Sequence, residues 1–191
     1  MDAPQIALEV AAALDDQQVA YMLVGSFSSN VYGVPRSTKD ADFVIQHPGL
    51  SFRRLLEKLG PRFIGDPQLR FEGVTGTTRH VIEVVDHAFK VELFRLTDDP
   101  FDQSRFSRRV RNQVAGVAVW LPRPEDVVVQ KLRWWKHGAR SKDIEDARAV
   151  ISVQGNQLDW SYIQHWCDQL ESREILDELR QTAIIDEPRV P

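Results

Sequence analysis

The first third of the chain alternates amphipathic and apolar segments. Apolar residues between positions 6 and 14 recur at helical spacing, which predicts a helix ahead of the apolar run Tyr21–Val24. That run predicts a buried strand. Gly25 and Ser26 then open a short helix, which Gly33 and Pro35 end. The pattern therefore predicts helix, strand and helix in the first third of the chain.

A second group of strands follows. Asp40–Ile45 is predicted as a strand and 51–59 as a short amphipathic helix. Alternating apolar and polar residues over 79–86 and 89–96 predict a hairpin, and a further strand pair is expected around 108–111 and 116–121.

From Pro124 onward the pattern is helical. Pro124, followed by two acidic residues, marks a helix start, and His137-Gly138 marks its end. Further helices are expected over 141–153, 159–170 and 172–184. The sequence thus predicts an α/β (α+β) part over residues 1–122 and a small helical C-terminal part over residues 123–191.

The composition suits a folded intracellular protein. At 191 residues and 42% hydrophobic, the chain can bury a substantial core. The single cysteine, Cys167, excludes an internal disulfide and a cysteine-based zinc site, and fits a reducing compartment. The N-terminus lacks the pattern of a signal peptide, and no apolar run approaches the roughly 18 residues of a membrane span. We expect a cytoplasmic protein with no membrane partner.

Charge is unevenly distributed. The formal net charge is −4, but residues 105–148 hold eleven Lys/Arg against five Asp/Glu, so this segment carries +6 and the remainder −10. A polyanion such as RNA is compatible with this segment, although a solvated helical face is the commoner reason for such a run.

Two aspartates form the first candidate site. Asp40 and Asp42 alternate along one strand, so their carboxylates share a face while Ala41 and Phe43 point to the core. Such a pair is also common at solvated strand ends. As a site, it suits one or two Mg²⁺ ions, which prefer carboxylate oxygens and leave positions for phosphates. Gly25-Ser26 at a helix start would let a triphosphate approach the backbone and its N–H donors.

The stretch "LVGSFSSNVYGVPRSTKDADFVI" resembles the nucleotidyltransferase superfamily, whose fold is shared with polymerase β. The signature is an apolar strand, Gly-Ser, a short spacer and Asp-x-Asp, here Gly25-Ser26 and Asp40-Ala41-Asp42. The resemblance implies a mixed β-sheet flanked by helices, an enzyme that uses nucleoside triphosphates with Mg²⁺, and a third acid on a later strand. Glu92 in "FKVELFRL" occupies that place, and Glu83 is its competitor.

The segment between the glycine and the acids extends this resemblance. Arg36 and Thr38 in "PRSTKDADF" are similar to the Arg-x-Thr that often precedes the acids in the superfamily. The resemblance implies that Arg36 and Thr38 belong to the nucleotide-binding residues.

The segment "PEDVVVQKLRWWKHGARSKDIEDARAVI" resembles the AbiEii-type toxins and related minimal nucleotidyltransferases. The matching features are the Pro-Glu-Asp helix start, Lys131 before leucine, and the acids Asp143 and Asp146. The resemblance implies that Lys131 and Asp143 help to bind the nucleotide, so that the helical part completes the nucleotide site. The alternatives are a lysine that packs its stem while its head stays in water, and a salt bridge between Asp143 and a neighbouring base.

The residues and the two resemblances together predict a metal-dependent nucleotidyltransferase, with Asp40, Asp42 and Glu92 as catalytic and metal-binding residues. The AbiEii resemblance implies RNA or a tRNA end as acceptor, a toxin role and a cognate antitoxin partner. Two alternatives stay open: a small-molecule nucleotidyltransferase of the aminoglycoside type, and a catalytically degenerate nucleotide-binding module. No nucleophile elbow, Walker lysine or dinucleotide fingerprint is present.

Overall fold

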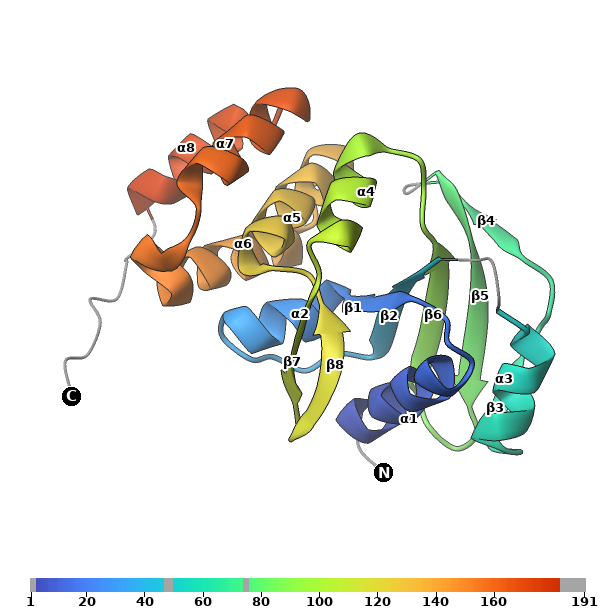
Figure 1. Cartoon of the computed structure of the whole chain (residues 1–191). Helices are drawn as coiled ribbons and strands as arrows, with labels where there is room; N and C mark the ends of the chain where they lie inside the picture. The colour runs from blue at the N-terminus through green and yellow to red at the C-terminus, as the bar shows by residue number, and fades with distance from the viewer. Residues whose placement is uncertain (1–2, 47–49, 74–75, 183–191) are drawn as a thin grey trace. The chain divides into compact units, whose positions relative to one another are not determined.

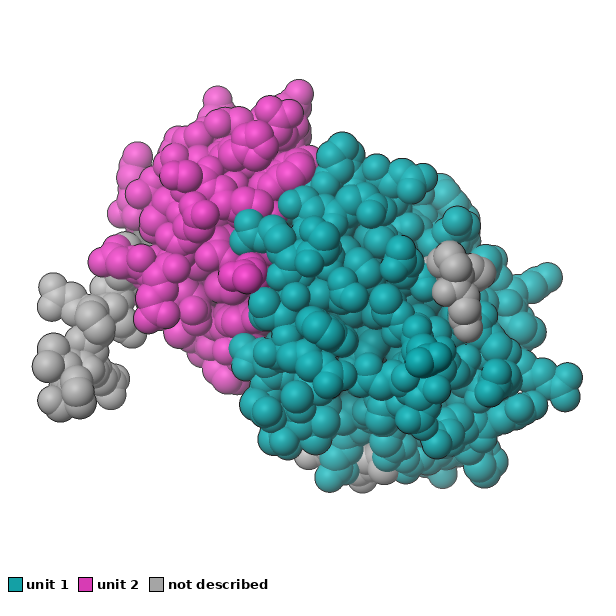
Figure 2. Space-filling model, viewed as in Figure 1, with its two compact units in different colours: residues 1–27, 37–122 teal, residues 28–36, 123–191 magenta. Residues whose placement is uncertain are grey.

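A computed structural model of the chain describes residues 3–46, 50–73 and 76–182, and divides them between two compact units (Figures 1 and 2). Unit 1 comprises residues 1–27 and 37–122, and unit 2 comprises residues 28–36 and 123–191. The main segment of unit 2 begins at Arg123. Unit 2 also includes residues 28–36, which the sequence prediction left in the first domain. None of the described helices is both long and apolar enough to span a bilayer.

Unit 1 is built on a mixed β-sheet. Within the described residues the sheet has six strands in the order β1-β2-β6-β5-β3, with β4 also paired to β5. Strands β2 and β6 are parallel and the other pairs are antiparallel. The strands are β1 (Tyr21–Val24), β2 (Asp40–Ile45), β3 (Phe63–Gly65), β4 (Arg70–Glu72), β5 (Thr77–Val84) and β6 (Lys90–Arg95).

One face of this sheet is the apolar core of unit 1. It carries Tyr21, Phe43 and Leu93, which are almost completely buried, and the rings of Tyr21 and Phe43 meet edge to face at 5.8 Å. Helices α1 (Ala3–Asp16) and α3 (Phe52–Leu59) contact each other, and Phe52 stacks on His80 of this face. The prediction that Ala41 and Phe43 face the core is confirmed by their burial, and Ile45 on the same strand face is buried as well.

The opposite face carries a buried apolar cluster at one end. Met22, Val24 and Val44 form a buried cluster there with Phe106 of α4 (Pro100–Ser107). Asp99 caps α4 by accepting a hydrogen bond from the Asp102 backbone N–H at 3.0 Å. The remainder of this face carries the charged side chains described below. A separate two-stranded sheet pairs β7 (Val110–Val114) with β8 (Val117–Leu121).

Unit 2 is helical. It contains α5 (Pro124–Gly138), α6 (Ser141–Gln154), a short 3-10 turn (Gly155–Gln157), α7 (Trp160–Gln169) and α8 (Arg173–Thr182). Helix α2 (Gly25–Tyr32) begins in unit 1 and continues into unit 2. As expected, α5 begins with proline at its first position. The helix predicted over 172–184 is described only to Thr182, because its last two residues lie outside the described part of the chain.

The predicted elements are present, with β5 beginning and ending two residues earlier than the predicted strand over 79–86, and with strand ends shifted by a few residues in the 108–121 region. Four elements were not predicted: β3, β4, α4 and the short 3-10 turn. The two strands have three residues each, and Ile64 and Phe71 in them are exposed, so they show no apolar alternation. Helix α4 had a readable signal in the pair Asp99-Pro100, an N-cap residue followed by proline at the first helical position.

Candidate active site

Three predicted acids lie on one face of two neighbouring strands. In the parallel pair of β2 and β6, Asp42 is the Cα partner of Glu92, and Asp40 is the partner of Lys90. Paired residues project from the same face, and so do residues two apart on one strand. The register therefore brings Asp40, Asp42 and Glu92 to the same face, at the end not covered by the apolar cluster.

Gly25 stands directly against one of these acids. Its φ is +64°, a left-handed conformation that residues with a Cβ rarely adopt. A Cβ at this position would lie 2.4 Å from Oδ2 of Asp42. Glycine is therefore required twice, once for the turn from β1 into α2 and once for the approach to the carboxylate. Ser26, the next residue, is buried.

Thr38 fixes the other aspartate. Its hydroxyl donates to Oδ1 of Asp40 at 2.8 Å, and lies 3.1 Å from the Asp40 backbone oxygen. The structure thus brings Thr38 to the acidic pair as a contact of Asp40. Its predicted contact with a nucleotide stays a prediction.

Glu92 and Glu83 differ in their distance from the aspartates along the sheet. Glu92 is on β6, next to β2, whereas Glu83 is on β5, one strand further away, where it pairs with Lys90. Adjacent strands are about 4.8 Å apart, so Glu83 starts roughly twice as far from β2 as Glu92. The register favours Glu92 over Glu83 as the acid nearest to Asp42.

Two bases that the sequence prediction missed hold Glu92. Lys90 Nζ lies 2.5 Å from Oε1 of Glu92, and Arg79 Nη1 lies 3.2 Å from Oε2. Lys90 could have been found from sequence, because it lies two residues before Glu92 on the same strand face. Arg79 could not, because its place depends on the register between β5 and β6, which the predicted hairpin did not fix.

The donor chemistry of the two aspartates fits a hard divalent cation, and the missing Cβ of Gly25 lets the Asp42 carboxylate lie directly against the backbone of the turn. A complete set of ligands is not assembled. Among the described residues no three His, Cys, Asp or Glu side chains stand close enough to hold a metal ion together. The side chain of Glu92 is engaged by Lys90 and Arg79 instead. Binding of Mg²⁺ therefore stays a prediction, and the oxygen donors of Asp40 and Asp42 suit that ion.

In unit 2, the predicted residues bind one another. Lys131, at the centre of α5, pairs with Asp143 at 3.1 Å and with Asp146 at 2.7 Å, and all three are buried. Arg36 forms two hydrogen bonds of 2.7 Å with the carboxylate of Asp146, and Arg140 binds Asp143 at 2.8 Å. Desolvation opposes ionisation of Asp146, but the hydrogen bonds and charges of Arg36 and Lys131 outweigh it and lower the pKa of Asp146.

The buried network changes the interpretation of Lys131. Its side chain is only 4% exposed, so the alternative of a lysine with its head in water is wrong. The alternative of a salt bridge at Asp143 describes what the structure has. The contacts of Arg36, Lys131 and Asp143 with a nucleotide stay predictions.

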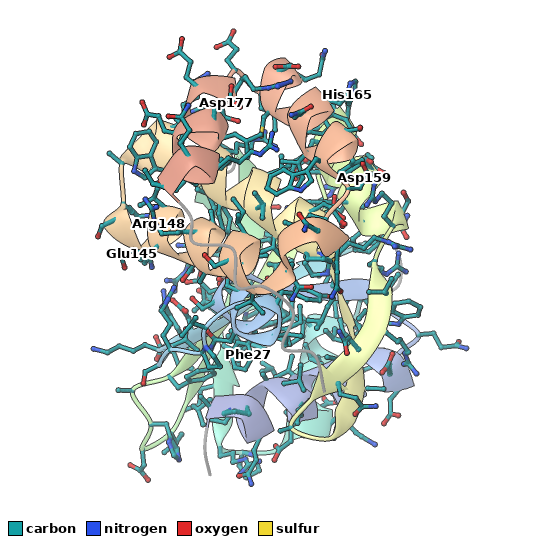
Figure 3. All side chains as sticks on the ribbon, turned by 90° about the vertical axis from the view of Figure 1, so that its left-hand side faces the viewer. Phe27, Glu145, Arg148, Asp159, His165 and Asp177 are labelled. Carbon is teal, nitrogen blue, oxygen red and sulfur yellow. The ribbon has the colours of Figure 1, made fainter. Side chains whose placement is uncertain are left out.

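The basic segment 105–148 is not one exposed surface. Besides Lys131, Arg105 is buried and pairs with Asp102 at 2.9 Å. Other members are at the surface, for example Arg148 on α6 (Figure 3), which donates to the Thr182 hydroxyl at 2.5 Å. The positive charge counted along the sequence is therefore partly neutralised inside the protein.

A pocket of about 380 Å³ in unit 2, lined by residues that include Trp160 and Asp177, holds none of the predicted site residues.

A mixed sheet in which a strand runs through glycine into a helix, followed by alternating aspartates on the neighbouring strand, defines the class of nucleotidyltransferases. The comparisons with known proteins agree. The chain belongs to the family DUF6036, described as a nucleotidyltransferase of unknown function, whose model matches residues 5–185. The family and the fold make the chain a nucleotidyltransferase, whereas membership of the AbiEii-type group stays a prediction. Comparison with curated protein sequences found no match.

Solved structures share the fold at low sequence identity. The chain is similar to ANT(2'')-Ia, solved in complex with adenylyl-2''-tobramycin, with 15% identity and a TM-score of 0.59 over 90% of this chain and 98% of that one. It is also similar to an antigenic nucleotidyltransferase-like protein from Paracoccidioides brasiliensis, with 19% identity and a TM-score of 0.57 over 95% and 93% of the two chains. JHP933 from Helicobacter pylori gives 15% identity and a TM-score of 0.54, over 94% and 80%. These similarities show the fold. Enzymes that share a fold can act on different acceptors.

Proposed function

We propose that the chain transfers a nucleoside monophosphate from a nucleoside triphosphate to a hydroxyl group of RNA. The observation that carries the proposal is the register of β2 and β6, in which Asp42 and Glu92 are partners and Asp40 shares their face. Carboxylates on one face of adjacent strands suit metal-assisted transfer of a phosphoryl group.

The role of each residue follows from its position. Asp40 and Asp42 would hold Mg²⁺, which when bound neutralises charge on the triphosphate. The missing Cβ of Gly25 lets the Asp42 carboxylate lie against the start of α2, whose backbone N–H groups suit phosphate oxygens. Glu92 accepts the proton of the acceptor hydroxyl. The hydroxyl oxygen forms a bond to the α-phosphorus, the bond from that phosphorus to the bridging oxygen breaks, and pyrophosphate leaves.

The finer assignments have narrower support. The AbiEii resemblance of the segment after Pro124 supports RNA as the acceptor. A toxin role and a cognate antitoxin rest on the same resemblance and stay predictions. The small-molecule alternative draws on the structure of ANT(2'')-Ia, whose likeness to this chain is one of fold. The degenerate alternative draws on the ion pairs that hold Glu92.

Label transfer tests the proposal. Purified protein is incubated with Mg²⁺, each α-labelled nucleoside triphosphate in turn and total bacterial RNA, beside the double variant Asp40→Asn/Asp42→Asn. The matched control is Asp86→Asn, which removes an exposed carboxylate from the turn between β5 and β6. We expect label on RNA with the wild type and with Asp86→Asn, and none with the double variant or with a chelator present.

Two results would contradict the proposal. Equal labelling by the double variant would remove the aspartates from the reaction. Triphosphate binding without transfer to any acceptor would indicate a binding module instead of an enzyme.

A further inference from the structure

Glu92 is bound on both sides by positive charge. Each of its carboxylate oxygens pairs with a different base, Oε1 with Lys90 at 2.5 Å and Oε2 with Arg79 at 3.2 Å. The Glu92 side chain is 8% exposed, whereas that of Lys90 is 48% exposed and that of Arg79 27%. The carboxylate is therefore covered by two cations that themselves reach solvent.

The two bases belong to the same sheet face as the acids. Lys90 is the Cα partner of Asp40, and Arg79 is the partner of Phe94, which lies two residues beyond Glu92. The Arg79 guanidinium lies 5.5 Å from the centre of the Phe94 ring. Lys90 and Arg79 are thus held beside the acids by strand register and an aromatic contact.

Arg79 also has unused hydrogen-bonding capacity. Its Nε is buried and has no hydrogen-bond partner among the described residues, and Nη1 is the atom that binds Glu92. A guanidinium has five N–H donors in a fixed planar arrangement, which suits two oxygens of a phosphate. Glu92 engages only one of these nitrogens, and because Nε is buried, an oxyanion would gain its N–H only if the partly exposed Arg79 side chain turned toward it.

The ion pairs of Glu92 with Lys90 and Arg79 affect the proposed proton transfer. In the observed arrangement each Glu92 oxygen pairs with a cation, so an incoming hydroxyl proton has to compete with Lys90 and Arg79 for the carboxylate. A phosphate that attracts Lys90 and Arg79 would release it. A cationic acceptor would be repelled by both bases and would leave Glu92 bound.

We propose that Lys90 and Arg79 select an anionic acceptor, by binding the RNA phosphates next to the reacting hydroxyl, and that this contact releases Glu92 to accept the hydroxyl proton. The bases are specificity-determining residues, and Glu92 becomes competent only when the acceptor is in place. The inference rests on the proposed function and adds the chemical class of the acceptor and the residues that recognise it.

RNA binding is measured first, because it does not depend on catalysis. A short fluorescein-labelled oligoribonucleotide is titrated with wild type, Lys90→Gln, Arg79→Gln and Lys90→Arg, and binding is followed by fluorescence anisotropy at several salt concentrations. The matched control is Arg95→Gln, which removes an exposed arginine from the same strand. Arg95 lies an odd number of residues after Lys90, so its side chain projects from the other face of the sheet.

The expected result is a loss of about tenfold in affinity for each of Lys90→Gln and Arg79→Gln, the size of one charge-assisted hydrogen bond. The slope of log affinity against log salt falls by about 1 for each lost phosphate contact. Lys90→Arg keeps the charge and retains most of the affinity, and Arg95→Gln binds as the wild type does.

Label transfer with total bacterial RNA and with tobramycin, a polyamine, then separates selection from a structural effect. We expect Lys90→Gln to raise KM for RNA while kcat and KM for the triphosphate stay near the wild-type values, and we expect tobramycin to receive little label. RNA binding by both glutamine variants at wild-type affinity would overturn the inference, as would tobramycin labelled as efficiently as RNA. RNA binding that depends on Lys90 and Arg79 without any transfer would support the contact and refute the proposed enzyme.

Discussion

Gly25→Ala tests the link between the glycine turn and the acidic face. Gly25 has a φ of +64°, and a Cβ there would lie 2.4 Å from Oδ2 of Asp42. A residue with a Cβ in the left-handed region costs about 1–2 kcal/mol. The overlap with Asp42 adds to this cost or turns the carboxylate away from its position. Because a displacement near 1 Å at a reacting site can cost about a hundredfold in rate, we expect label transfer to fall by that order.

Gly76→Ala is the matched control. Gly76 has the same φ of +64°, and no described atom lies within 4 Å of a Cβ at this position. It should show the backbone cost of about 1–2 kcal/mol with normal transfer. Urea denaturation followed by circular dichroism gives the free energy of unfolding, and label transfer gives the activity. If the two alanine variants lose the same stability and both keep full activity, the Asp42 contact is irrelevant and the reasoning is refuted.

Three further predictions concern unit 2. Asp143→Ala leaves Lys131 with half of its buried partners and should lower the free energy of unfolding by about 3 kcal/mol, whereas Glu57→Gln, in an exposed pair, should change it by less than about 1 kcal/mol; urea denaturation checks both. Ion pairs lower the pKa of Asp146, so the stability it contributes is present above the ordinary aspartate pKa of about 3.9 and is lost as the pH falls through the lower folded value; Asp146→Asn should remove this acid-sensitive part from a denaturation series in pH. Burial raises the pKa of the Cys167 thiol to about 11, so dithiobisnitrobenzoate should react with it at neutral pH only as the protein unfolds, and a fast reaction with the native protein would contradict this.

The sequence was sufficient where local pattern and burial agree. The runs Tyr21–Val24 and Asp40–Ile45 are apolar or alternating over their whole length, and both are strands with those bounds in the structure. Their pairing register, with Val24 opposite Asp42, places the acids beside the turn into α2. A predicted motif could therefore be converted into a predicted geometry, because the strand period fixes which side chains share a face.

The sequence was insufficient where partners come from distant segments. Asp143 follows Lys131 by twelve residues and lies on the next helix, so a count of charges along the chain does not show that part of the basic segment is a buried network. Arg79 and Glu92 meet through the register of the β5–β6 hairpin, which the predicted strand bounds did not fix. Helix packing in the first case and strand register in the second, and not residue type, decided these contacts.

The ion pairs of Glu92 with Lys90 and Arg79 are weaker evidence against a catalytic role of Glu92 than the register of β2 and β6 is evidence for it. Lys90 and Arg79 are 48% and 27% exposed, so solvent screens the pairs from their side, whereas Glu92 is 8% exposed and its buried carboxylate needs a partner. Exchanging these pairs for phosphate contacts of the two bases is therefore inexpensive only when the acceptor hydroxyl donates to Glu92 in their place. Moving Glu92 away from Asp42 would require a new register between β2 and β6, which also pairs the buried Phe43 with Leu93, and a slip of one residue would turn apolar side chains to the wrong face. The backbone thus holds the acids together firmly while the partners of the Glu92 carboxylate can be exchanged, which is the combination that an acceptor-dependent proton transfer requires.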